Sequence, residues 1–239
     1  MPVSGVSALG GLLVLGVVAA GGLYAGDRYA ESRAEQYAST VVSQNIPTTA
    51  APTVDIKGFP FLTQLWTGTL DEVTATAPGA TLDGIPVTDV SVDATAVDIR
   101  PPAGQQPKAG HATIAATIPT ASLEQVVKDK SGLTVQLAID GTTVKASGEV
   151  LKLPLTLTLV PRVENGKLLV DAQGLSLGGR EITAQSLPAA LRGRITGIEI
   201  PVQGLPKGLT LSRAEVVPTG LRITADGTNV SVPQTAPAA

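Results

Sequence analysis

The sequence predicts an α+β fold in which short antiparallel strands predominate. Beyond Gly68, glycine and proline separate short runs that are rich in Val, Ile, Leu and Thr. Asp-Gly and Asn-Gly pairs stand between several of these runs, and such pairs are typical of β-hairpins. Two segments, 27–46 and 119–130, instead carry apolar residues at helical spacing. Strands in the majority with two separate helices indicate the α+β class.

The N-terminal segment, residues 1–26, contains no Asp, Glu, Lys, Arg or His. Its run 6–26 has about the 20 residues that cross a bilayer. We predict either an uncleaved transmembrane anchor or a cleaved signal peptide, and the lack of Lys and Arg before the run favours the anchor. Both place the rest of the chain outside the cytoplasm. One domain is expected over residues 27–232, followed by a disordered Pro/Ala-rich tail at 233–239.

The first elements after this segment are a helix, a strand and a short helical turn. The spacing of Ala30, Ala34 and their apolar neighbours predicts a helix over Asp27–Ile46, which Pro47 ends. A strand is predicted at Thr53–Lys57. Phe61, Leu62, Leu65 and Trp66 then recur at helical spacing, which predicts one or two turns that Gly68 closes.

The following segments alternate as strands do. Leu155, Leu157 and Leu159 alternate with polar residues, which predicts a strand with one buried face. Hairpin turns are predicted at Asp140-Gly141, Asn165-Gly166 and Asp226-Gly227. Between Ile85 and Ile99 the apolar phase changes twice, which indicates bulges in a long, bent strand.

A second helix is predicted over Pro119–Lys130, from Leu123, Val126 and Val127 at helical spacing. Ser122 and Gln125 are placed for a capping box, and Gly132 ends the helix. Another short helix is predicted at Leu187–Arg192.

The composition limits the classes of function. The only Phe and Trp residues lie between Phe59 and Trp66, so the interior must be built mainly from aliphatic side chains. There is no cysteine, which excludes disulfides, and the net charge of −3 argues against a nucleic-acid partner. With a single histidine, His111, a zinc site is nearly excluded. We expect no metal and no cofactor.

One catalytic pattern occurs, Gly174-Leu175-Ser176-Leu177-Gly178, which matches the G-x-S-x-G element of serine hydrolases. That element needs a strand-to-helix turn and a later histidine, but a strand-like segment continues past Ser176 and His111 precedes it. We therefore interpret Ser176 as an ordinary strand residue and expect no catalytic site. A hydrolase that uses Ser176 is the less favoured hypothesis.

Two stretches resemble the LmeA-like family of actinobacterial cell-envelope phospholipid-binding proteins. They are Asp55–Leu62 with Gln64 and Gly68, and Leu205–Leu211 with Gly220-Leu221-Arg222-Ile223 and Gly227. The resemblance implies a tubular lipid-binding fold, in which a strongly bent antiparallel sheet wraps a long N-terminal helix and holds lipid in the gap. It also implies phosphatidylinositol-type lipid and a role in lipomannan-like glycolipid assembly.

The candidate lipid-binding residues are the aromatic block and two arginines. Phe59, Phe61, Leu62 and Trp66 are expected at the mouth of a lipid groove, and the alternative is that they plug one end of the core. Arg192 and Arg194 are the candidates for an anionic headgroup, because Arg forms bidentate bonds to phosphate.

These observations predict a non-catalytic protein at the outer face of the plasma membrane, or in a periplasm-like space if the signal is cleaved. It would carry or present anionic glycerophospholipid for glycolipid assembly, with envelope glycosyltransferases as further partners. The alternative is an extracytoplasmic scaffold that stabilises a membrane glycosyltransferase without carrying lipid. A tightly closed core would favour the scaffold.

Overall fold

The computed structural model describes residues 24–40, 42–43, 48–82, 84–103, 105–131, 134–150, 153–183, 198–200 and 205–231. In these residues the strands form two antiparallel sheets of six strands each. Sheet A contains, in spatial order, β1 (Thr53–Lys57), β2 (Thr69–Leu82), β3 (Ile85–Asp98), β4 (Lys108–Pro119), β12 (Gly220–Ser231) and β11 (Leu209–Val217). Sheet B contains β10 (Ile198–Ile200), β8 (Lys167–Leu177), β7 (Leu153–Glu164), β6 (Thr143–Val150) and β5 (Gln136–Asp140), and β9 (Arg180–Thr183) also pairs with β8.

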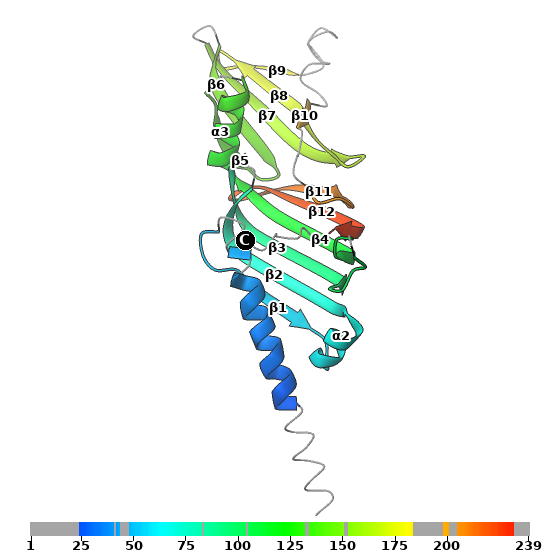
Figure 1. The fold of residues 1–239 in the computed structure, drawn as a ribbon. Coiled ribbons are helices and arrows are strands. Elements are labelled where there is room, and N and C mark those ends of the chain that lie inside the picture. Colours follow the sequence, from blue (N-terminus) through cyan, green and yellow to red (C-terminus); the bar gives the residue numbers. More distant parts are fainter. Residues whose placement is uncertain are drawn as a thin grey trace, which may run out of the picture.

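The two sheets correct the expectation of one sheet wrapped around a helix. β12 returns to pair with β4, from Gly220 opposite Pro119 to Ser231 opposite Lys108. That pairing completes sheet A and leaves the strands between β4 and β11 to form a sheet of their own. Figure 1 shows sheet B at the end of the molecule opposite the N-terminal helix.

The N-terminal helix covers residues 24–40 and 42–43, so it begins before the predicted Asp27. It lies beside β1, the edge strand of sheet A, rather than inside a wrapped sheet (Figure 1). Ala30 and Ala34 pack against the core, as their spacing predicted. Among the described residues, no helix combines the length and the apolar character needed to cross a bilayer. Residues 1–23 and the predicted tail at 233–239 lie outside the described residues.

Sheet A bends along a line that crosses several strands. Leu70 and Val73 in β2, Ala94 and Val97 in β3, and Ala109 and Ala112 in β4 all belong to one core cluster or pack against it. In a regular strand, residues on the same face are two apart, but the residues of each of these pairs are three apart. The alternation of inward and outward side chains therefore shifts by one residue in all three strands, at the same level of the sheet. Ala96 and Asn229, at this level, have φ values of 50° and 51°. The result is a curved sheet whose apolar residues face one way on both sides of the bend.

One of the two bulges predicted in β3 is confirmed. The first change of phase coincides with Asp89, whose φ is 50°, and with a register shift between Thr88 and Ser91 against β4. The second change of phase coincides with Ala96, whose φ is 50°, but β3 stays in register with β2 and β4 there, so the predicted second bulge is wrong.

Two of the three predicted hairpins are confirmed, at Asp140-Gly141 between β5 and β6 and at Asn165-Gly166 between β7 and β8. The third, Asp226-Gly227, is wrong, because both residues lie within β12. Gly227 is required there by close packing, since a Cβ atom would lie 1.9 Å from the Gly208 carbonyl oxygen. Residues 218–219 make the turn between β11 and β12.

Helix α3 (Thr120–Ser131) confirms the second predicted helix and connects the two sheets. The predicted capping box is wrong: Ser122 Oγ donates to the Pro86 carbonyl at 2.9 Å, and Gln125 Nε2 donates to Asp129 at 2.8 Å. Ser122 thus ties α3 to sheet A. Glu124 accepts a bond of 2.6 Å from the Leu137 amide and ties the helix to sheet B.

Candidate functional site

The aromatic block forms helix α2 (Phe61–Thr67), which confirms the predicted turns and ends at Gly68 in the left-handed conformation. Its residues do not share one environment. Phe61 is 1% exposed and belongs to the core cluster, whereas Trp66 is 85% exposed and Phe59 and Leu62 are about half exposed. Phe61 therefore follows the alternative weighed from the sequence, in which an aromatic side chain plugs one end of the core.

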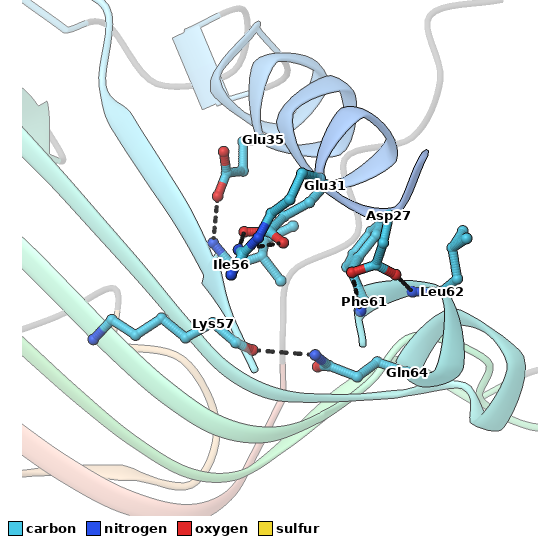
Figure 2. Close-up of polar contacts among 9 residues, drawn as sticks. Asp27, Glu31, Glu35, Ile56, Lys57, Phe61, Leu62 and Gln64 are labelled. Atoms are coloured by element: carbon cyan, nitrogen blue, oxygen red, sulfur yellow. Dashed lines mark hydrogen bonds and ion pairs between the residues drawn. The ribbon is translucent and has the colours of Figure 1, made fainter. Parts of the chain in front are cut away.

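Gln64 and Gly58 explain why the motif around α2 needs these residue types. The buried Gln64 side chain donates to the Lys57 carbonyl at 3.3 Å (Figure 2). It also accepts from the Asp71 amide at 2.8 Å. Gly58 has a φ of 103°, and a Cβ atom there would lie 2.5 Å from Asp71 Oδ2 and 2.6 Å from Gln64 Nε2. Only glycine fits. These contacts hold α2 between the end of β1 and the start of β2.

The N-terminal helix is joined to this unit by two carboxylates, which Figure 2 shows. Asp27, buried, accepts from the amides of Phe61 at 2.9 Å and Leu62 at 2.7 Å. These are the first amides of α2, which would otherwise lack an intrahelical partner. Glu35 accepts a bond of 2.9 Å from the Ile56 amide in the edge strand β1. The sequence reasoning missed both carboxylates, because their partners are backbone amides distant in the chain.

Sheet B presents the second candidate surface, an almost purely aliphatic face. Register places Leu137, Ala146, Leu157 and Leu175 side by side across β5, β6, β7 and β8. The adjoining row on the same face is Ile139, Val144, Leu159 and Ala172. The opposite face carries Gln136, Ser147, Thr156 and Ser176 in one row. We call the two apolar rows, together with Leu155, the aliphatic face.

The aliphatic face is incompletely buried. Val144, Ala146 and Ala172 are buried, but the leucines at 155, 157, 159 and 175 are only half-buried. The core cluster instead reaches sheet B at Leu168, with Val163 packed against it. Methylene groups of the larger side chains on this face thus stay accessible, where more apolar surface could be buried favourably.

A hollow of about 410 Å³ lies where the two sheets meet. It is lined by Thr142, by Val160 and Pro161 of β7, and by residues 214–217 of β11. Its walls are aliphatic side chains, the Thr142 hydroxyl and one carboxylate, Glu215. Its volume falls in the range of small-ligand pockets.

Ser176 is confirmed as a strand residue. It lies within β8, between Thr156 of β7 and Glu181 of β9, and not at a strand-to-helix turn. His111 lies in sheet A, opposite Thr95 and Thr228. Among the described residues, no three Asp, Glu or His side chains form a group that could hold a metal ion.

The predicted headgroup residues Arg192 and Arg194 lie outside the described residues, as does the short helix predicted at Leu187–Arg192. Both arginines stay predictions. So does lipid contact by Phe59, Leu62 and Trp66.

The family model described as LmeA-like phospholipid-binding matches residues 25–226. The chain belongs to the LmeA-like phospholipid-binding family. The match takes in the N-terminal helix, both sheets and α3, so the resemblance inferred from two short motifs extends over most of the chain. No curated protein and no solved structure shows a significant match to it.

Because the family binds phospholipid, both the region around α2 and the aliphatic face of sheet B are candidate lipid-contact surfaces. The intramolecular contacts of the motif residues Gly58, Gln64 and Gly68 hold α2 in place. None of the residues of the aliphatic face belongs to the sequence motif around α2. The signal that could have identified it was the run Leu155, Leu157 and Leu159, which the sequence analysis interpreted only as a buried face.

Proposed function

We propose that the chain is a non-catalytic phospholipid-binding protein and that the aliphatic face of sheet B receives the acyl chains. The observation that carries the proposal is a row of half-buried leucines, in a member of a phospholipid-binding family. An interior made only for stability normally buries such side chains completely. Here the larger side chains on β5, β7 and β8 stay partly accessible.

The energetics are sufficient for useful affinity. Burial of one methylene contributes about 0.8 kcal/mol. Ten methylenes placed on the aliphatic face would therefore contribute about 8 kcal/mol, which corresponds to a dissociation constant of about 1 μM before the cost of ordering the lipid. Acyl chains can thus be held without a specific polar contact, and selectivity would come from the headgroup.

The lipid class and the biological role extend the proposal. We assign an anionic glycerophospholipid of the phosphatidylinositol type, with Arg192 and Arg194 as the groups that meet its phosphate. The protein would carry or present this lipid at the outer face of the plasma membrane, for envelope glycolipid assembly of the lipomannan kind. Support comes from the family resemblance and from the uncharged segment at residues 1–26.

Native mass spectrometry of the purified full chain tests the proposal, because it detects lipid that stays bound to the folded protein. The matched variant is Leu157→Gln, which places a polar group in the middle of the aliphatic face. Thr158→Gln, on the opposite face, is the control. We expect phospholipid masses on the native chain and the control, and several-fold less on Leu157→Gln. Equal lipid on all three would show that it binds elsewhere, and no lipid on the native chain would refute the proposal.

A further inference from the structure

Four large apolar residues are exposed together at the end of the molecule where the N-terminal helix begins. They are Tyr24 on that helix, Phe59 just before α2, and Leu62 and Trp66 on the outer side of α2. The Tyr24 and Phe59 rings lie 5.7 Å apart. Leu62 and Trp66 are four residues apart in a helix, so they point to the same side. We call these four residues the aromatic patch.

Such exposure is unusual for these residue types. A tryptophan normally buries most of its large surface, yet Trp66, the only one in the chain, is 85% exposed. Grouped exposed apolar side chains mark a surface that contacts something else. Tyr and Trp are the residues that gather where a bilayer meets water, because their rings combine apolar and polar parts.

The aromatic patch is held as one unit. Asp27 bonds the amides of Phe61 and Leu62, so the start of the N-terminal helix and α2 keep a fixed relation (Figure 2). The inward side of α2 is secured by Phe61 in the core and by the bonds of Gln64. The exposed side chains therefore do not need to serve the fold.

The chain itself indicates what covers the aromatic patch. Residues 1–26 carry no Asp, Glu, Lys, Arg or His, and the run 6–26 is of spanning length. This segment joins the described helix at Tyr24, which is part of the patch. The first cation after it, Arg28, has its guanidinium carbon 5.6 Å from the Tyr24 ring centre and 5.8 Å from that of Phe59. A cation at this level suits the phosphates of a lipid headgroup layer.

We infer that the aromatic patch docks into the headgroup layer of a phospholipid bilayer, at the point where residues 1–26 enter it. Trp66 and Leu62 would then insert beside the segment, while Arg28 lies at the level of the phosphates. This surface is separate from the aliphatic face of sheet B, so the inference goes beyond acyl-chain binding. It gives the protein a fixed orientation on the membrane, with α2 against the lipid.

Trp66 fluorescence tests the docking directly, because no other tryptophan contributes. The full chain is reconstituted into vesicles of equimolar phosphatidylcholine and phosphatidylglycerol, with a fraction of lipid that carries a nitroxide near the headgroup. We expect strong quenching of Trp66 by this lipid and several-fold protection from aqueous iodide. If the chain binds the vesicles while Trp66 stays open to iodide, or if it does not bind them, the inference is overturned.

Variants separate the aromatic patch from exposed aromatic residues in general. Phe59→Ser combined with Leu62→Ser removes apolar contact without touching the buried Phe61, and should lower the lipid quenching of Trp66 several-fold. Tyr37→Ser, at an exposed position elsewhere on the N-terminal helix, should leave it unchanged. If lipid quenching of Trp66 is equally strong in the double variant and in Tyr37→Ser, the inference is overturned. Leu157→Gln should also leave Trp66 quenching intact, so failure of docking and failure of acyl-chain binding are distinguishable.

Discussion

Sheets A and B each place aliphatic side chains on one face, but they close that face to different degrees. In sheet A the core residues include the small Ala109, Ala112 and Ala225, which let the curved sheet pack closely, and Phe61 fills the end. In sheet B the corresponding positions on β7 are leucines that stay half-buried. Alternation therefore identifies the apolar face of a strand, while the elements packed against it decide whether that face becomes core or binding surface.

The largest expected effect is on folding stability and tests the buried face of sheet A. Among the described residues, Phe61 is the largest apolar side chain that is fully buried, so Phe61→Ala should lower the free energy of unfolding by about 3 to 5 kcal/mol. Chemical denaturation measures this cost. Leu62→Ala, at the exposed neighbour, should change stability far less. A small effect of Phe61→Ala would mean that sheet A is not closed at this end.

The next effect concerns the carboxylate that holds this end together. Asp27→Ala leaves the amides of Phe61 and Leu62 without their acceptor, and each unpaired amide costs roughly 1 to 3 kcal/mol. We expect a loss of about 2 to 6 kcal/mol in denaturation. Asp27→Asn keeps one acceptor oxygen and should recover part of that loss. If both variants are as stable as the native chain, the N-terminal helix is not held by this contact.

Leu157→Gln tests the partly accessible aliphatic face of sheet B, where a substitution should affect lipid binding more than stability. A half-buried position costs less to alter than Phe61, so stability should fall less than in Phe61→Ala. Lipid affinity should fall by about tenfold, because the variant removes apolar contact from the middle of the aliphatic face. Displacement of a fluorescent acyl probe measures affinity. The prediction fails if stability collapses while the lipid bound per folded molecule is unchanged.

The smallest effect lies on the polar side of sheet A. Hydrogen bonds from Ser212 and Thr113 lower the pKa of Asp226 below its usual range. A lowered folded pKa stabilises the fold above the unfolded value of about 3.9, and this contribution disappears as the pH falls through the lowered folded pKa. Asp226→Asn should therefore be less stable than the native chain at neutral pH, with a difference that shrinks below about pH 4. Denaturation at pH 7 and at lower pH checks this, and a difference independent of pH would contradict it.

Local features of the fold could be predicted from the sequence. The turns at Asp140-Gly141 and Asn165-Gly166, helix α2 and the bulge at Asp89 follow from a few neighbouring residues. The division into two sheets could not be predicted, because it depends on pairing β4 with the distant β12. Asp226-Gly227 has the composition of a turn, yet Gly227 is set by its close approach to Gly208.

The candidate sites divide in the same way. The aromatic block was identifiable because its residue types are rare in this chain. Which of its side chains face the core was not, since Phe61 and Leu62 are adjacent and differ only through what packs around α2. The leucines of β7 were visible as a pattern, but their partial burial is a property of the assembled sheet.

The acyl-binding role of sheet B is tested most directly by a phospholipid with a photoreactive group at the end of its acyl chain. After irradiation of the folded chain with this lipid, the labelled residues are mapped by mass spectrometry. We predict labels on β5–β8, concentrated at Leu157 and its neighbours on the aliphatic face, and loss of these labels in competition with unmodified phospholipid. Labels confined to α2 and the N-terminal helix, or no label that competes, would contradict acyl-chain binding by sheet B.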